Sequence, residues 1–490
     1  MTQSTSETQS TNPKFLWVLF FVEMWERFSY YGMRAILVLF LTSKLGFADG
    51  KAYATYSVSA ALAFAVPVLG GILADRLMGF RNMVFLGGIV ITIGHISMTL
   101  IPLEPNLTYF GLALIAVGTG CFKGNVTNLL GACYKDNYSG REKGFTVFHV
   151  SVNLGSFLAG ISCGVVAHKF GWHYAFGLAG FGMIIGLLTF LKYEYIFKDC
   201  GSSPRPDLMK KNLFLGLKIT QILFAACLVL AIGVMVILQN STSFDNLLKY
   251  LGVLIGLIFT GVIYYADSDS RKNLIVLIIL IIFLMFFLAL EMQLGSLINL
   301  FASRNVVQSV FGITIPAALS QSINPFSILV FGFLVSNFIT FNKKFALAKF
   351  AFGLLTMAIC FGILYIGCTE ANEHGRVDYI YLFSAISFMG LGEIMTIPFI
   401  YSQLTLLAPP KLKGFMMGIL MLSLAFSNLA GLVISKFMSI PSLKGEVDSL
   451  QSLPIYQEGF LEITKFNMIL FLIFLLFIPI INKLLKKPVK

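Results

Sequence analysis

Titratable side chains are concentrated in residues 23–34, inside an apolar run from about residue 15 to residue 41 that is long enough to cross a bilayer as a helix. At about 100° per residue, six of them fall within an arc of about 140° and so share one helix face: Glu23, Glu26, Arg27, Tyr30, Tyr31 and Arg34. A charge at mid-membrane costs about 2.5–3.5 kcal/mol on insertion scales, so such groups normally face a protein-lined or water-filled cavity. One interpretation is a structural ion-pair network between helices. Two acids, two bases and two phenols on one face favour the other, a site that binds a ligand and titrates.

Further polar residues lie within later apolar runs. Lys123 lies in the middle of one run, among residues too small to shield it, and therefore needs an anionic partner such as Glu23 or Glu26. The alternative is a lysine whose long side chain reaches the membrane surface. The other runs contribute a second set of candidate contacts for a ligand: His149, Asn153, Glu291, Gln293, Asn324, Glu393 and Ser402.

The intramembrane charges divide between the two halves of the chain. The N-terminal half contributes the bases Arg27, Arg34 and Lys123, and the C-terminal half contributes Glu393 together with amide and hydroxyl groups. A cavity that is positive on one wall and negative on the other suits a zwitterion whose two charges are well separated. A peptide, with a carboxylate at one end and an ammonium at the other, is such a ligand.

The composition indicates a polytopic membrane protein. The 490 residues are 57% hydrophobic and only 12% charged, with a mean hydropathy of +0.85. Residues 1–13 lack the positive segment and the cleavage site of a signal peptide, so we predict that they form a cytoplasmic tail. The seven cysteines are scattered and odd in number, and we expect free thiols rather than a disulfide framework or a metal site.

The net charge of +12 would suggest a nucleic-acid partner in a soluble protein. Here Lys and Arg gather in alternate loops between the apolar runs, which is the positive-inside pattern of a multi-pass inner (plasma) membrane protein. We therefore expect the lipid bilayer and no nucleic acid as a partner, and both chain termini in the cytoplasm.

The apolar runs predict an all-α fold with fourteen transmembrane helices in a 6+2+6 arrangement. They lie near residues 15–41, 53–75, 82–102, 107–130, 144–167, 173–194, 213–238, 248–266, 273–301, 310–337, 345–367, 377–406, 413–436 and 463–482. This arrangement resembles the major facilitator superfamily fold of two six-helix bundles. The predicted parts are a tail (1–13), an N-terminal bundle (14–194), a linker with two extra helices (195–270), a C-terminal bundle (271–485) and a second cytoplasmic tail (486–490).

The segment after the second run also resembles that superfamily. Residues 71–81 match the signature loop G-x-x-x-D-R-x-x-G-x-R, in which Asp75 can pair at a neighbouring helix end and Arg76 lies at the basic face. We expect Asp75 and Arg76 to belong to a cytoplasmic gate loop whose glycines allow a tight turn.

The pattern E-x-x-E-R-F-x-Y-Y-G-x-R, from Glu23 to Arg34, resembles the hallmark of the proton-dependent oligopeptide transporter family. Stretches similar to that family continue along nearly the whole chain: residues 118–125, 153–156, 171–177, 321–325, 349–353, 392–402 and 415–418.

The resemblance implies a role for each matching position. The bases Arg27, Arg34 and Lys123 are expected to receive the carboxylate of a peptide, and Glu393 its amino end. The expected pocket residues are Tyr31, Asn153, Gln293, Asn324 and Ser402. The expected proton-coupling residues are Glu23, Glu26, Arg27 and Lys123.

This sequence departs from the family pattern at three positions. The acid of the seventh run, Glu291, lies one residue early, which turns it by about 100° from the place of the family's gating salt bridge. Phe64 and His149 stand where the family has tyrosines, and His149 adds an imidazole, a group that ordinarily titrates near neutral pH.

The resemblance implies a symporter that imports di- and tripeptides by alternating access. An intramembrane salt bridge is expected to break when an acid is protonated, the proton gradient takes the place of a cofactor, and the expected state is a monomer. The alternative is proton-coupled or facilitated transport of another small anion or zwitterion, such as nitrate, an amino-acid derivative or a peptidomimetic. The five histidines show no metal-ligand spacing, and the chain shows no nucleophile motif, so we do not expect an enzyme.

Overall fold

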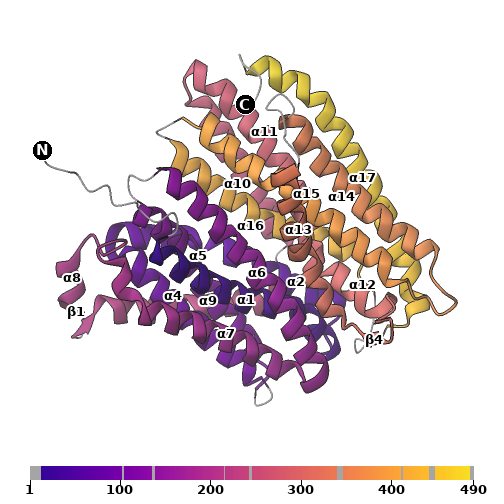
Figure 1. The fold of residues 1–490 in the computed structure, drawn as a ribbon, viewed down its shortest axis with the longest axis horizontal. Coiled ribbons are helices and arrows are strands. Elements are labelled where there is room, and N and C mark those ends of the chain that lie inside the picture. The colour runs from indigo at the N-terminus through magenta and orange to yellow at the C-terminus, as the bar shows by residue number, and fades with distance from the viewer. Residues whose placement is uncertain are drawn as a thin grey trace, which may run out of the picture. The chain divides into compact units, whose positions relative to one another are not determined.

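The computed structural model describes residues 13–101, 104–134, 138–214, 216–241, 245–338, 346–409, 412–440 and 447–485. Nearly all of these residues are helical, which confirms the predicted all-α class. Figure 1 labels the elements along the chain. The strands among the described residues form two small antiparallel hairpins, β1–β2 (Asn212–Phe214, Leu217–Lys218) and β3–β4 (Ser309–Val310, Ile313–Thr314), and turns and short loops join the helices.

A helix lies at each of the fourteen positions where an apolar run predicts one. Those of the first half are α1 (Lys14–Ser43), α2 (Asp49–Ala65) with α3 (Pro67–Leu73), α4 (Gly79–Thr99), α5 (Leu107–Tyr134), α6 (Tyr138–Phe170) and α7 (Trp172–Lys192). They are followed by α8 (Pro206–Lys210), α9 (Ile219–Gln239), α10 (Asp245–Tyr264), α11 (Ser268–Glu291) with α12 (Leu297–Asn305), α13 (Ile323–Phe338), α14 (Ala346–Thr369), α15 (Tyr379–Leu407), α16 (Lys413–Phe437) and α17 (Ser449–Leu484).

Eleven helical segments within the described ranges are long and apolar enough to cross a membrane. Helix α1 is not one of them because its charged residues interrupt the apolar composition. The count of fourteen membrane crossings therefore stays a prediction. So do the boundaries at residues 194 and 270 between the two bundles and the linker.

Two of the predicted spans contain breaks. The second span bends at Pro67, which begins α3 and cannot donate a backbone hydrogen bond to α2. The seventh span is interrupted between α11 and α12 by a 3-10 turn (Met292–Gly295). The eighth begins later than predicted, because β3–β4 and a 3-10 turn (Ala317–Ser322) precede α13.

Asp75 and Arg76 lie on a helical turn rather than in an irregular loop, and their expected part in a cytoplasmic gate stays a prediction. The chain continues from α3 through a π-helical turn (Ala74–Met78) directly into α4, and both residues are exposed on that turn. The tight bend is made by Gly79 alone, whose φ of 75° is unfavourable for a residue with a side chain.

The helices group into two compact units. Unit 1 comprises Met1–Tyr31, Val66–Ser156 and Phe176–Gly233, and unit 2 comprises Gly32–Ala65, Phe157–Ala175 and Val234–Lys490. The boundary falls inside α1, so the predicted site residues of this helix divide between the units after Tyr31.

Glycines permit the close helix packing of unit 1. A Cβ atom on Gly118 of α5 would lie 2.7 Å from the backbone nitrogen of Ile91 in α4, and one on Gly94 of α4 would lie 2.9 Å from the Gly111 carbonyl oxygen of α5. Any side chain at these positions would force the helices apart. An apolar core that includes Leu19, Phe122 and Met183 completes the packing.

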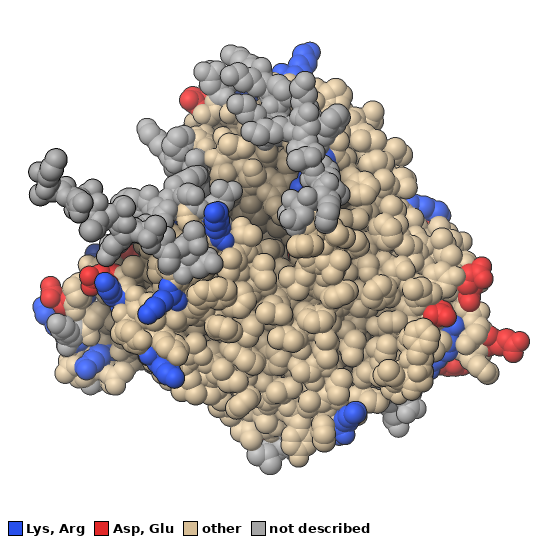
Figure 2. All heavy atoms as spheres, viewed as in Figure 1, with Lys and Arg blue, Asp and Glu red and all other residues tan. Residues whose placement is uncertain are grey.

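Aromatic side chains dominate the core of unit 2 around α17. Phe301, Tyr456 and Phe460 pack edge to face or stacked, with ring centroids 5.0–6.0 Å apart. Helix α17 is 36 residues long, and its N-terminal part carries exposed charges, including an ion pair between Lys465 and Glu462 at 2.7 Å. The described surface in Figure 2 carries few charged side chains over wide areas, as expected for helices that face lipid chains.

Candidate functional site

The predicted charge cluster forms on α1 within unit 1. The Arg27 Nε atom lies 3.2 Å from the Glu23 Oε1 atom, one helical turn earlier, and the Arg27 guanidinium also binds the Glu26 carboxylate. All three side chains are buried. Burial of two carboxylates is costly unless they are paired, so one guanidinium between them explains why the α1 sequence tolerates both acids at membrane depth.

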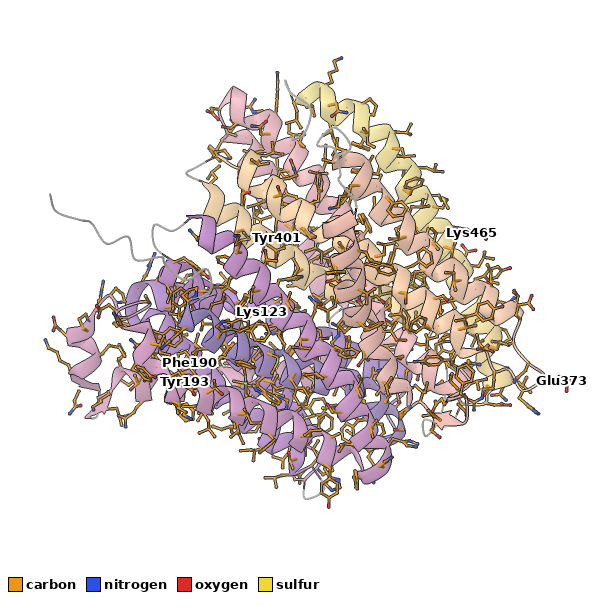
Figure 3. All side chains as sticks on the ribbon, viewed as in Figure 1. Lys123, Phe190, Tyr193, Glu373, Tyr401 and Lys465 are labelled. Atoms are coloured by element: carbon orange, nitrogen blue, oxygen red, sulfur yellow. The ribbon has the colours of Figure 1, made fainter. Side chains whose placement is uncertain are left out.

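The pairing in this cluster is incomplete. The Glu23 Oε2 and Glu26 Oε1 atoms have no hydrogen-bond partner among the described residues. Lys123 on α5, labelled in Figure 3, also interacts electrostatically with Glu23. Each carboxylate thus keeps one oxygen on which a proton can bind. The predicted pair of Glu26 and Lys123 stays a prediction, because the described partner of Glu26 is Arg27.

Helix α6 approaches α1 beside this cluster. A Cβ atom on Gly155 would lie 3.1 Å from the Arg27 Cβ atom, so only glycine lets the two helices come this close. Asn153 and His149 lie one turn apart on this part of α6, and the Asn153 Nδ2 atom lies 3.3 Å from the His149 Nε2 atom. His149 and Asn153 therefore share a face, as their spacing predicts, with Asn153 buried and His149 exposed.

A second group of predicted residues lies in unit 2 around Arg34. The Arg34 Nε atom donates a hydrogen bond of 2.6 Å to the Tyr56 hydroxyl of α2, and its Nη2 atom lies 3.7 Å from the Met292 sulfur. Gly295, in the turn after α11, leaves room for the Tyr56 hydroxyl, which any Cβ atom there would displace. Sequence reasoning missed Tyr56, because a tyrosine in an apolar run gives no sign of its partner.

Glu393 lies beside Asn324 in the same unit. The Asn324 Nδ2 atom lies 3.4 Å from the Glu393 Oε2 atom, and the Asn324 Oδ1 atom has no described hydrogen-bond partner. Arg34 and Glu291 both interact electrostatically with Glu393, one with opposite and one with like charge. The structure thus brings Arg34 of α1 together with three predicted residues of the C-terminal half, Glu291, Asn324 and Glu393.

Three other predicted residues have different surroundings. Gln293 is fully buried, and its amide joins the α11–α12 break to α16: it donates to the Gly431 carbonyl at 3.0 Å and accepts from the Ser435 hydroxyl at 2.6 Å. Ser402 is exposed on α15, and Phe64 is half-buried on α2. Contacts of these side chains with a ligand stay predictions.

A buried ion pair that the sequence analysis did not find joins α2 to α12 in unit 2. Both Arg304 guanidinium Nη atoms lie 2.7 Å from the two carboxylate oxygens of Asp49. The Ile440 backbone nitrogen also donates to Asp49 at 3.1 Å, and Arg304 reaches the Tyr456 hydroxyl at 3.3 Å. Such a bidentate pair is among the strongest polar links between elements.

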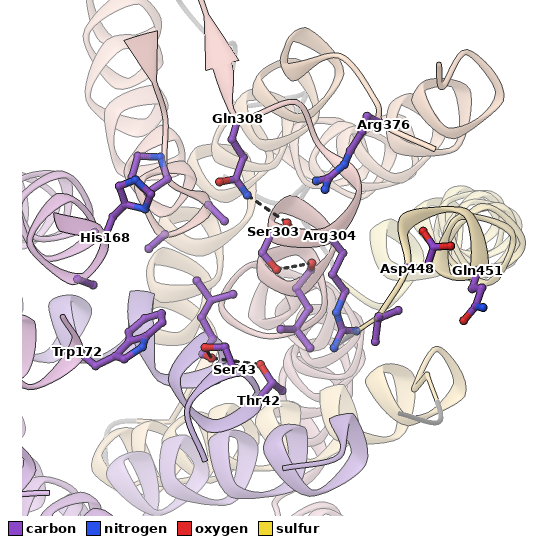
Figure 4. Close-up of a pocket in the computed structure, with 18 residues that line it drawn as sticks. Thr42, Ser43, His168, Trp172, Ser303, Arg304, Gln308, Arg376, Asp448 and Gln451 are labelled. Atoms are coloured by element: carbon purple, nitrogen blue, oxygen red, sulfur yellow. Dashed lines mark hydrogen bonds between the residues drawn. The ribbon is translucent and has the colours of Figure 1, made fainter. Parts of the chain in front are cut away.

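A cavity of about 860 Å³ lies beside this ion pair (Figure 4). Its lining includes Arg304, Trp172 of α7, His168 at the end of α6 and Arg376 before α15. The predicted topology places this side of unit 2 outside the cell. None of the predicted ligand-binding residues is among the described residues that line the cavity.

Long apolar helices with a buried, partly paired charge cluster define the class of the protein as a helical membrane transporter. The model of the POT family matches residues 81–451. The dipeptide and tripeptide permease B of Photorhabdus asymbiotica is 32% identical over 487 residues, covering 96% of this chain and 96% of the relative. The dipeptide and tripeptide permease A of Escherichia coli is 30% identical, covering 99% and 95%. The chain therefore belongs to the POT family.

Solved structures confirm the predicted major facilitator fold. A bacterial homologue of the human drug peptide transporters PepT1 and PepT2 has a TM-score of 0.82 at 27% identity, covering 96% of this chain and 98% of that one. The tetrameric PepTSo2 has a TM-score of 0.83 at 27% identity, covering 96% and 99%.

Proposed function

We propose that this protein is a proton-coupled symporter that imports di- and tripeptides across the inner membrane by alternating access. The names of the relatives, dipeptide and tripeptide permeases, favour this substrate class over nitrate or another small anion. The observation that carries the proposal is the charge cluster, in which Arg27 binds both Glu23 and Glu26 while each acid keeps an unpartnered oxygen.

Protonation of this cluster provides the coupling step. A proton on Glu23 or Glu26 removes one negative charge, so Arg27 loses part of its attraction to the acids and becomes available to a ligand carboxylate. Lys123, which interacts with Glu23, becomes available in the same way. One proton that moves down 100 mV releases about 2.3 kcal/mol, which is sufficient to concentrate a neutral zwitterion several tens of fold.

The groups around Glu393 suit the other end of a peptide. Glu393 supplies a carboxylate for an ammonium group, and the unpartnered Asn324 Oδ1 atom beside it can accept a further N–H bond. Arg34, held by Tyr56, supplies a guanidinium of opposite charge. Carboxylate and ammonium of one zwitterion can therefore each meet an opposite charge within the set of predicted residues.

In this proposal the ion pair of Asp49 and Arg304 holds the outer side closed. It links α2, a helix of the predicted N-terminal bundle, to α12 of the predicted C-terminal bundle. Asp49 and Arg304 therefore move apart when the protein reaches the outward-open state. Both termini lie in the cytoplasm in this proposal, the working unit is a monomer, and no covalent chemistry is performed on the substrate.

Uptake of labelled dialanine into proteoliposomes tests the proposal. We expect accumulation of several tens of fold with an inward proton gradient and none when an ionophore dissipates it. Labelled nitrate in parallel vesicles serves as the competing substrate. Nitrate accumulation without dialanine accumulation would overturn the proposal.

A further inference from the structure

Two cysteines that are distant in the sequence meet inside unit 1. The Sγ atoms of Cys121 in α5 and Cys227 in α9 lie 3.9 Å apart, although 106 residues separate them in the chain. Both are buried, with 4% and 8% of their surface exposed. Among the seven free cysteines, this is the one pair for which a sulfur–sulfur contact occurs within the described ranges.

Glycines fix the position of Cys121 on α5. Gly120, directly before it, packs on Val66, and a Cβ atom on Gly70 of α3 would lie 3.1 Å from the Cys121 Cα atom. The backbone of α5 therefore rests directly against α3 at this level and has no room to shift in that direction. The Cys121 side chain reaches α9, so the thiol pair marks where the inserted helix contacts the N-terminal half.

The inserted helices have different neighbours. Just beyond the other end of α9, the Ser241 hydroxyl lies 3.3 Å from the Thr55 hydroxyl of α2. Helix α10, in contrast, packs on a helix of the C-terminal half, where a Cβ atom on Gly252 would contact the Phe426 ring of α16 at 3.4 Å. Helix α9 thus contacts α5, the chain just after α9 contacts α2, and α10 contacts α16.

We propose that Cys121 and Cys227 are a disulfide-forming site through which α9 is fixed to α5. In the oxidation each thiol gives up its proton and one electron, the two sulfurs join, and an apolar two-electron oxidant is reduced. With molecular iodine the products are the disulfide, two protons and two iodide ions. The sulfurs must approach by about 2 Å, which rotation about the two Cα–Cβ bonds can supply.

The oxidant must dissolve in lipid, because both sulfurs are buried. The outer face of α9 is apolar and accessible at Val229 and Ile232, which are 69% and 55% exposed. An apolar oxidant can therefore reach this helix from the bilayer, whereas a charged oxidant in water cannot. Because Cys227 lies in the same compact unit as Cys121, this part of α9 travels with α5 during transport, and the tether does not stop the cycle.

Thiol counting on the full chain in membrane vesicles tests the site. Vesicles are treated with iodine. The protein is then denatured and labelled with N-ethylmaleimide, and its mass is measured by mass spectrometry. We expect seven labelled thiols before oxidation and five after it, with the missing pair mapped to one linked peptide. Cys121→Ser and Cys227→Ser should each show six labels in both states. Cys163→Ser, which removes a buried cysteine without a described thiol neighbour, should change from six to four.

The outcomes separate the site from the transport proposal. Failure of the linked peptide to form in folded membranes overturns the disulfide site, whatever the substrate. Dialanine uptake by the oxidised protein should stay within twofold of the reduced protein, and a tenfold loss that dithiothreitol reverses would overturn the fixed position of α9. No uptake in either redox state would instead count against the proposed function. In that case, comparing the rate of cross-linking with and without a proton gradient would decide whether α9 moves relative to α5. We expect equal rates.

Discussion

The buried ion pairs of the two units differ in how completely their acids are partnered. In unit 2, Asp49 accepts bonds from both nitrogens of Arg304 and from a backbone N–H, so both of its oxygens are occupied. In unit 1, Glu23 and Glu26 share a single guanidinium, and each keeps one oxygen without a described partner. Full pairing favours a fixed charge and a structural link, whereas partial pairing leaves a place for a proton. The acids of this protein are therefore distinguished by how fully their oxygens are partnered rather than by burial.

The largest effect is expected where pairing is complete. Asp49→Asn leaves the Arg304 charge buried without a counter-ion, which typically costs about 3–5 kcal/mol of unfolding free energy. The thermal midpoint of the purified protein, measured by near-ultraviolet circular dichroism, should fall by several degrees. Asp448→Asn is the control, because Asp448 is an exposed helix cap and asparagine caps equally well. Equal midpoints for the two variants would contradict the structural role of Asp49.

The second prediction concerns the partly paired acids. Glu26→Gln cannot release a proton, so gradient-driven accumulation should fall from several tens of fold to about onefold, a loss of about 2.3 kcal/mol of coupling. Exchange between equal pools of peptide should continue. Proteoliposome uptake and counterflow measure the two activities separately. Glu462→Gln, on the exposed pair of α17, is the control. Full accumulation by Glu26→Gln would show that its free oxygen has no part in coupling.

Glu393 has an intermediate degree of pairing, with a long contact of 3.4 Å to Asn324. If it contacts the substrate ammonium, Glu393→Gln should weaken binding of free dipeptides by about tenfold, the usual scale for a hydrogen bond to a charged group. N-acetylated dipeptides lack the ammonium and should be little affected. Competition against labelled dialanine measures both affinities. Equal losses for the two ligand types would indicate that Glu393 is structural.

The smallest effect is expected at His149, whose described polar contact is with Asn153 at 3.3 Å. His149→Phe should weaken peptide affinity by about fivefold, because one neutral hydrogen bond contributes about 1 kcal/mol. His149→Tyr restores a polar group at the same place and should retain affinity. An unchanged affinity and pH profile in His149→Phe would remove this side chain from the pocket.

The sequence alone was sufficient for the features that depend on local spacing. Helical periodicity placed Glu23, Glu26 and Arg27 on one face, and the cost of a charge in lipid indicated that Lys123 must meet an acid. The structure agrees, since Arg27 binds both acids and Lys123 acts on Glu23. Apolar runs likewise located a helix at every predicted position.

Features that depend on packing between distant segments could not be predicted in this way. Asp49 and Arg304 lie 255 residues apart at the ends of apolar runs, where charged residues are ordinary and give no sign of burial. Tyr56 looks like any aromatic residue of an apolar helix until Gly295 makes room for its hydroxyl. The π-helical turn at Asp75 was missed because the signature glycines, Gly71 and Gly79, were interpreted as part of a loop, whereas of these two only Gly79 has a positive φ.

The length of α17 has a practical consequence for imaging. Its 36 residues span about 54 Å, whereas the hydrocarbon core of a bilayer is about 30 Å thick. No charged residue lies between Lys465 and Lys483, and this apolar part of the helix has about the length of the core. The first turns, about 24 Å in length, therefore form a rigid post outside the lipid. A fiducial protein fused to this post, or an antibody fragment bound to it, would move little relative to the transporter and would provide a landmark for aligning particle images in electron cryomicroscopy.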